Sequence, residues 1–176
     1  MKKYAIITMD VEDWYHTYFP EANVDRSISL LDGLDVALDI MKKDDIHGSF
    51  FVVGEIADKL ADKLREMDKE GHDIAVHNCQ HLRPVTMTPD EFRSQLLEAK
   101  RKIEEILGHQ VYGYRAPSFG IDDERLDIVR ECGFKYDSSK LKPQKSAKYG
   151  VLNLKDFKET IPCVHQTKGF TEFEVS

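Results

Sequence analysis

The sequence predicts an α/β fold in which parallel strands alternate with helices. Short apolar runs rich in β-branched and aromatic residues recur along the chain, and longer segments with helical spacing lie between them. Glycines stand just beyond several of these longer segments, where helices commonly end. Strands that alternate with helices form right-handed βαβ units and a parallel sheet. No Pro- or Ser-rich linker divides the 176 residues, so we expect one domain, 1–176.

The first half of the chain contains three predicted strands and two predicted helices. The strands are the short apolar runs Tyr4–Met9, His47–Val53 and Asp73–Val76. A polar, aromatic loop follows the first strand, from Asp10 to about Asn23. The helices span Ser27–Lys43, which has apolar residues at helical spacing, and Glu55–Glu70, which Gly71 ends.

The second half continues the same alternation. Thr88 begins a helix that runs to about Leu107, because Thr-Pro-Asp-Glu supplies an N-cap, a proline in the first turn and early acids. A shorter helix, Asp122–Cys132, follows. The strands of this half are Val111–Tyr114, one that begins at Phe134–Tyr136, and Glu159–Val164 as a sixth. Five or six strands are fewer than a complete eightfold barrel needs, so we expect an incomplete or truncated β/α barrel, with an open doubly wound sheet as the alternative.

Composition narrows the classes of partner and the compartment. The net charge of −7 and the lack of a long basic stripe argue against nucleic acid or an anionic membrane as the main partner. No stretch approaches the roughly 20 apolar residues of a membrane span. Three widely spaced cysteines are no disulfide framework, and the short apolar run near Met1 lacks the features of a signal peptide. We therefore expect a cytoplasmic protein.

Chemically useful residues follow three of the predicted strands directly. They form the segments Asp10-Val11-Glu12-Asp13-Trp14, His77-Asn78-Cys79-Gln80-His81 and Arg115-Ala116-Pro117-Ser118-Phe119. The carboxyl ends of the strands share one face in parallel β/α folds, and sites are built there. Residues about a hundred positions apart in sequence are therefore expected to meet in space.

The first two segments together favour a metal site. His77 and His81 are spaced to grip one ion, either one helical turn apart or side by side on a loop. The acidic residues between Asp10 and Asp13 repel one another unless a cation or hydrogen-bond donors offset their charge. Two histidines and one carboxylate leave positions open for water and substrate, as a hydrolytic metal requires. The alternative is an ordinary solvated loop with a chance histidine pair.

Arg115 and the aromatic residues of the loop after the first strand have two interpretations each. Arg115 precedes Ala-Pro, which holds its backbone extended, so its side chain is suited to bind a carboxylate bidentately or to form an ordinary surface ion pair. Aromatic side chains suit the apolar faces of sugar rings but also form a loop's own small core. The aromatic residues in question are Trp14, Tyr15, Tyr18 and Phe19.

Three motifs resemble those of the polysaccharide deacetylase family, the carbohydrate esterases with the nodulation-deacetylase homology domain. Thr8-Met9-Asp10 resembles the start of the family's Thr-Phe-Asp-Asp motif. His77-Asn78-Cys79-Gln80-His81 resembles His-Ser/Thr-x-x-His, and Arg115-Ala116-Pro117-Ser118 matches Arg-x-Pro-Tyr except at its last residue. The segment Asp-Val-Glu-Asp-Trp is most similar to the corresponding segment of members associated with capsule, exopolysaccharide and O-antigen synthesis.

Three further segments extend the resemblance from residue 4 to about residue 162. Phe50-Phe51-Val52 resembles the family's Thr-Phe-Phe strand. Gly133-Phe134-x-Tyr136-Asp137-Ser138-Ser139 resembles a later family segment, and Thr160-Ile161-Pro162 is matched to the Glu-Ile-Pro that follows it. The resemblance therefore implies a β/α barrel of the polysaccharide deacetylase type.

The resemblance also implies an activity, the metal-dependent hydrolysis of an N-acetyl group on a sugar or polysaccharide precursor. Asp10 is the implied base and Arg115 orients it. Zn²⁺ is the implied metal, and Glu12, His77 and His81 are its implied ligands. Val11 separates the base Asp10 from Glu12, and Asp13 is the alternative to Glu12 as ligand. The backbone of Ser118 is the implied oxyanion donor, and Trp14 is assigned to the sugar. Alternatives are a related hydrolase of small linear or cyclic amides and a non-catalytic carbohydrate-binding remnant.

The chain departs from the family pattern near its C-terminus. The family's late histidine, which protonates the leaving amine, lies in a Leu-x-x-His or Ile-His-Pro segment that this sequence lacks. His165 is the one histidine after the fifth predicted strand, and its surroundings match no family motif. We therefore expect the last barrel strands and the general acid to be missing, and the 176-residue chain to be weakly active or inactive. An open flank would expose apolar surface and favour a homodimer.

Overall fold

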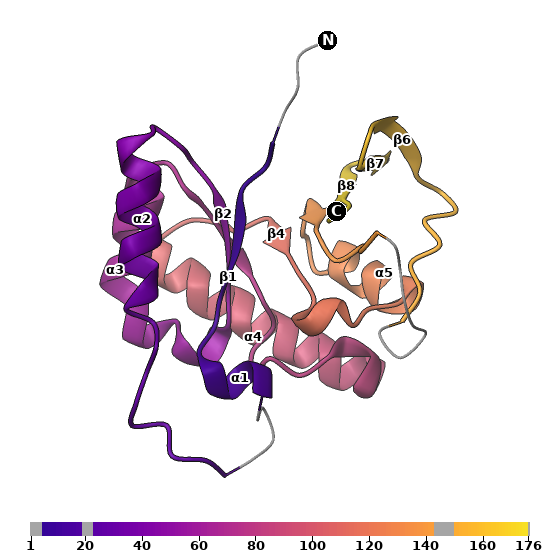
Figure 1. Cartoon of the computed structure of the whole chain (residues 1–176). Coiled ribbons are helices and arrows are strands. Elements are labelled where there is room, and N and C mark those ends of the chain that lie inside the picture. The colour runs from indigo at the N-terminus through magenta and orange to yellow at the C-terminus, as the bar shows by residue number, and fades with distance from the viewer. Residues whose placement is uncertain (1–4, 19–22, 143–149, 176) are drawn as a thin grey trace.

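The computed structural model describes residues 5–18, 23–142 and 150–175, and in this part of the chain eight strands form one sheet (Figure 1). The order across the sheet is β1-β2-β3-β4-β5-β8-β7-β6. Six strands are parallel: β1 (Thr8–Val11), β2 (Ser49–Val52), β3 (Asp73–Val76), β4 (Gly113–Tyr114), β5 (Tyr136–Asp137) and β8 (Phe170–Phe173). The hairpin of β6 (Lys158–Ile161) and β7 (Val164–Thr167) adds two antiparallel strands beyond β8. β1 and β6 are therefore the two edges of the sheet, and no described pairing closes it.

Five α-helices connect the strands in the described residues. They are α1 (Trp14–Tyr18), α2 (Gly33–Lys43), α3 (Ala61–Lys69), α4 (Pro89–Leu107) and α5 (Asp123–Glu131). Four short 3-10 turns accompany them, at Gly54–Ile56, Asp58–Leu60, Pro84–Thr86 and Pro117–Phe119. None of the helices in the described part of the chain has the length and apolarity to cross a membrane.

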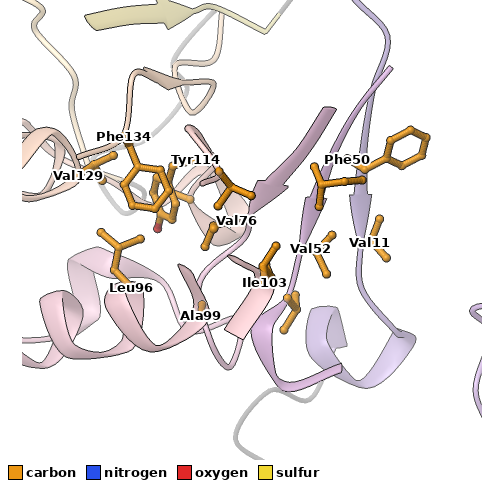
Figure 2. Close-up of a cluster of buried hydrophobic side chains, with 14 of the residues drawn as sticks. Val11, Phe50, Val52, Val76, Leu96, Ala99, Ile103, Tyr114, Val129 and Phe134 are labelled. Atoms are coloured by element: carbon orange, nitrogen blue, oxygen red, sulfur yellow. The ribbon is translucent and has the colours of Figure 1, made fainter. Parts of the chain in front are cut away.

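The core lies on the face of the sheet that α4 covers (Figure 2). Strand register aligns one residue from each of the first four strands in a single row, and all four are buried: Val11, Val52, Val76 and Tyr114. Figure 2 shows this row beside the α4 side chains Leu96, Ala99 and Ile103, which are fully buried. Side chains alternate across a strand, so Asp10, Phe51 and Ala75 face the other way, toward the barrel interior. This alternation positions the candidate site.

Helix α4 begins and ends as the sequence predicts. The Thr88 hydroxyl accepts a hydrogen bond from the Glu91 N–H at 3.3 Å, and the Glu91 carboxylate accepts one from the Thr88 N–H at 2.9 Å. Gly108 ends the helix with φ at 78°, a left-handed conformation that glycine adopts without steric cost. The predicted capping pattern is therefore confirmed at both ends.

Replacing Thr88 with alanine should destabilise the protein. The change removes the hydroxyl that accepts the Glu91 N–H, and loss of such a cap lowers the free energy of unfolding by about 1 kcal/mol. Urea denaturation followed by circular dichroism measures this. Thr88→Ser keeps the hydroxyl and should stay near the wild type, so equal stabilities of the two variants would contradict the assignment.

The two helices predicted in the first half begin later than expected. The segment before α2 is bound to Asp13, whose carboxylate accepts hydrogen bonds from the Ser29 hydroxyl and the Leu30 N–H, so residues 27–32 do not extend the helix. The segment Glu55–Leu60 forms 3-10 turns, because the Gly54 N–H bonds to the carbonyl of Asn78 and the Glu55 N–H to that of Cys79.

The first strand is also displaced from its predicted position. Its ladder with β2 starts at Thr8, so Asp10 lies inside β1 and not after it. Ile6 and Ile7 precede the ladder and are exposed. Tyr4, the predicted start, lies outside the described residues. The loop predicted after this strand contains the short helix α1.

The prediction of one strand at Glu159–Val164 is wrong. Cys163 adopts φ at 66° in a turn that divides the segment into the antiparallel strands β6 and β7. The sixth parallel strand is β8. Its segment, Phe170–Phe173, lacks the apolar pattern of a core strand because it contains the buried Glu172. Thr160-Ile161-Pro162 therefore lies on the hairpin, and Glu172 occupies the sheet position next to β5.

Candidate active site

The three chemically promising segments meet at the carboxyl ends of β1, β3 and β4. The His77 N–H donates to the carbonyl of Val52, and the Arg115 N–H donates to that of Val76, so the ladder continues one residue past β3 and β4. Both residues therefore lie two positions from an interior-facing strand residue and face the interior, as Asp10 does. The predicted convergence is present.

Glu12, His77 and His81 form a group that could hold a metal ion. One ligand atom from each lies within 4.8 Å of the other two. The Nε2 atom of His77 is 3.9 Å from Oε2 of Glu12, and Nε2 of His81 contacts the same oxygen. Within the described ranges, no other set of three or more His, Cys, Asp or Glu side chains meets this spacing.

His77 presents one ring nitrogen to this group. Its Nδ1 atom forms a hydrogen bond of 2.8 Å with the Arg115 carbonyl, which can only accept, so Nδ1 carries the hydrogen and Nε2 presents a lone pair. This Nε2 atom is buried and has no hydrogen-bond partner among the described residues. Burial lowers the pKa of His77, which favours the neutral ring that a metal needs. An unpartnered nitrogen aimed at a carboxylate and a second imidazole fits a divalent ion.

His81 reaches the group from a strained turn. Asn78 and His81 both adopt left-handed backbone conformations, with φ at 59° and 60°, which are uncommon outside glycine. The Asn78 side-chain amide stabilises the turn by donating to the Leu82 carbonyl at 2.9 Å. Of the two arrangements that the His-x3-His spacing allows, the structure has the loop.

The Glu12 carboxylate supplies negative charge to the group. Its burial raises the pKa, but the hydrogen bond with His81 and the electrostatic influence of the two histidines outweigh burial and lower the pKa to about 2. The Thr17 hydroxyl donates to its other oxygen at 2.8 Å, which leaves Oε2 facing the histidines.

Asp13, the alternative ligand, lies outside the group. Its buried carboxylate accepts hydrogen bonds from the N–H groups of Trp14 and Leu30 and from the Ser29 hydroxyl. These contacts tie the start of α1 to the segment before α2. Of the two acids, Glu12 therefore has the geometry of the candidate carboxylate ligand, whereas Asp13 stabilises the loop.

Arg115 connects Asp10 to the neighbouring strands. Its Nη1 atom donates to Oδ1 of Asp10 at 2.8 Å. The contact uses one nitrogen, so it is not the bidentate pair, which was one of the two arrangements that the sequence left open. The rest of the guanidinium is occupied, because Nε donates to the Ser138 carbonyl and Nη2 to the hydroxyls of Ser138 and Thr8, at 2.8–3.0 Å. The guanidinium also lies 4.1 Å above the ring of Phe51.

Thr8 and Ser138 lie in segments that resemble the family, but neither was predicted to contribute a contact to the site. Thr8 lies two residues before Asp10 and therefore on the same face of β1, a signal that period-two spacing could have supplied. Ser138 follows β5 and reaches Arg115 from 23 positions away, which no local pattern indicates.

The remaining predicted residues differ in their surroundings. Trp14 is partly buried and its indole N–H donates to the Ile28 carbonyl at 3.1 Å. Tyr15 is buried, with the guanidinium of Arg26 over its ring, so it belongs to the loop's own core. Ser118 is exposed, with a left-handed φ of 51° in the 3-10 turn after β4. The side chain of Tyr18 and all of Phe19 lie outside the described residues.

A family model for polysaccharide deacetylases matches residues 28–136, which is more than half of the chain. The chain belongs to the polysaccharide deacetylase family. The matched residues include His77, His81 and Arg115, whereas Asp10 and Glu12 precede them.

The chain is similar to curated proteins that include a peptidoglycan deacetylase. An uncharacterised 30.6 kDa protein of Geobacillus stearothermophilus is 30% identical over 125 residues, which are 66% of this chain and 47% of that protein. The peptidoglycan-N-acetylmuramic acid deacetylase PdaA of Bacillus subtilis is 28% identical over 120 residues, 64% of this chain and 46% of that protein. The chain therefore spans about half the length of these relatives.

Solved structures of the family share the fold. A Mycobacterium smegmatis protein assigned to the polysaccharide deacetylases superposes with a TM-score of 0.71 at 26% identity, covering 97% of this chain and 58% of that one. A CE4 family pseudoenzyme from Bacillus anthracis gives 0.59 at 23% identity, covering 72% and 40%. The predicted α/β class, with an incomplete barrel of this family's type, is confirmed.

Proposed function

We propose that this domain is a metal-dependent deacetylase that hydrolyses the N-acetyl group of a sugar or polysaccharide precursor. The observation that carries the proposal is the placement of Asp10, held by Arg115, beside the group formed by Glu12, His77 and His81. Oδ2 of Asp10 is 3.8 Å from Nε2 of His77, so the carboxylate that would act as base adjoins the nitrogen that would hold the ion.

Each residue has a defined task in this mechanism. A divalent ion, Zn²⁺ in our proposal, would be held by Glu12, His77 and His81 and would acidify water and polarise the amide carbonyl. Arg115 occupies Oδ1 of Asp10, which leaves Oδ2 free to accept the proton of the attacking water. The Ser118 N–H, on its left-handed turn, would donate to the oxyanion that forms at the carbonyl.

Membership of the family supports a carbohydrate substrate. Relatives are described as deacetylases of peptidoglycan, of its N-acetylmuramic acid, and of chitin. We place the substrate among precursors of cell-surface polysaccharides, reached in the cytoplasm, with Trp14 beside the sugar. The retained histidines favour catalysis over a sugar-binding remnant, because binding alone does not need a metal.

Acetate release from N-acetylglucosamine oligomers tests the proposal. We expect slow, Zn²⁺-dependent release that a chelator stops and added metal restores, and less release from small linear amides and cyclic ureides. The assay must detect weak turnover. His165 is the histidine to test first as general acid, but its ring already pairs with Glu174 at 3.3 Å on the hairpin side of the sheet. Oligomer binding without any acetate release at full metal occupancy would instead indicate a binding remnant.

A further inference from the structure

Two carboxylates occupy the end of the buried row on the helix-facing side of the sheet. Register continues the row of Val11, Val52, Val76 and Tyr114 to Asp137 on β5 and then to Glu172 on β8. Both acids are completely inaccessible to solvent, with exposed fractions of 0%. They lie on the face opposite to Asp10, so they take no direct part in the proposed chemistry.

The two carboxyl groups share their hydrogen-bond donors. The Ser139 N–H donates to Oδ2 of Asp137 at 2.9 Å and to Oε1 of Glu172 at 3.0 Å. The Lys140 N–H also donates to Oε1 of Glu172, and the Ser139 hydroxyl donates to Oδ1 of Asp137. One amide bound to both side chains holds the two carboxyl groups next to each other.

No described ion pair includes either acid. From β4, the Arg115 guanidinium bonds to Asp10, Thr8 and Ser138, and Tyr114 presents a buried hydroxyl. From β7, His165 lies opposite Glu172 in the ladder, but its ring pairs with Glu174. Two adjacent buried carboxylates without a paired cation do not both ionise, because desolvation and mutual repulsion oppose the second charge. Burial accordingly raises the pKa of both groups.

We propose that Asp137 and Glu172 share one proton and that this acid pair positions the turn Arg115–Ser118 from behind the sheet. The Ser139 hydroxyl, which donates to Asp137, accepts a hydrogen bond from the Ala116 N–H at 2.8 Å. The intervening Ser138 holds the Arg115 guanidinium. The acid pair thus fixes the two serines that fix the turn. The catalytic meaning of this arrangement rests on the proposed function.

The shared proton makes stability depend on pH. The pKa of Glu172 is raised in the folded chain, so above the ordinary glutamate value of 4.5 the unfolded chain loses a proton that the folded chain keeps. The stabilisation is complete below pH 4.5 and is lost as pH rises toward the folded pKa, by about tenfold in the folding equilibrium constant per pH unit.

Glu172→Gln tests the shared proton without any assay of activity. The amide of glutamine donates to Asp137 as the protonated acid would, and it has no proton to lose. The unfolding equilibrium constant of the wild type, divided by that of the variant, should rise about tenfold per pH unit above pH 5 in denaturant titrations. Glu105→Gln, at an exposed glutamate, is the control and should leave the ratio flat. A flat ratio for Glu172→Gln would overturn the proposal; if this variant fails to fold, Asp137→Asn provides the same comparison.

The positioning role has a spectroscopic readout. Raising the pH until the pair ionises fully should shift the backbone amide NMR signals of Ala116 and Ser139 together in the wild type and leave them unmoved in Glu172→Gln. Ser139→Ala, which cuts the link, should uncouple Ala116 from this titration. Signals that move equally in the wild type and Glu172→Gln would refute the positioning role. Absence of acetate release from every variant would refute the proposed function alone, since neither unfolding nor NMR depends on it.

Discussion

Replacing His77 and His81 together with alanine should abolish binding of divalent metal. The two imidazoles and Glu12 are the one described group with ligand spacing, and a lone carboxylate does not retain Zn²⁺ against water. Elemental analysis after dialysis against Zn²⁺ should therefore find the variant at the level of chelator-treated wild type. Calorimetric titration should find no heat of specific binding.

A matched control separates this effect from the loss of any two histidines. His47 and His109 are exposed and lie outside the group, so their double replacement by alanine should keep one metal per chain. Full metal content in the His77/His81 double variant would place the metal elsewhere and remove the basis of the proposed mechanism.

Asp10→Asn should retain most of its metal and lose hydrolysis by about 10²–10⁴-fold, the usual contribution of a positioned base. Asparagine keeps an oxygen that can accept the hydrogen bond from Arg115, but its amide cannot take a proton from water. Acetate release at equal metal occupancy measures the loss, and it requires a parent with measurable activity.

Asp39→Asn is the control for this variant, because Asp39 is an exposed carboxylate on α2 and its replacement should leave turnover unchanged. If Asp10→Asn instead loses its metal completely, Asp10 belongs among the ligands. A variant that keeps both metal and turnover would transfer the role of base to another residue.

Local patterns account for what the sequence predicted correctly. The capping box at Thr88 and the glycine at 108 act within one helical turn, so they mark α4 without tertiary information. The strand Asp73–Val76 was located to the residue, because it is short, apolar and directly followed by the histidine segment. The convergence of the three segments followed from the rule that parallel strands present their carboxyl ends on one face.

Long-range contacts explain what the sequence missed. The segment before α2 is helix-compatible in isolation, and Asp13 holds it in another conformation from 17 positions away. The sequence pattern does not indicate β8, because its buried Glu172 is stabilised by backbone donors more than 30 positions away. The partners of Arg115, on β1 and just after β5, depend on strand order, which no short motif encodes.

β1 lies at the edge of the sheet and leads directly to Glu12 of the candidate metal group, so the local stability of this strand is linked to metal binding. In the described sheet, Thr8–Val11 has a hydrogen-bonded neighbour on one side only, so its amides belong to the part of a sheet that opens most easily. Yet β1 carries Asp10, and Glu12 follows directly. Any ion held by Glu12 and the histidines, together with the Arg115 contact, would therefore close this strand against β2. Metal uptake and the ordering of the sheet edge would then be one equilibrium, and β1 amides would exchange with solvent more slowly as the site fills.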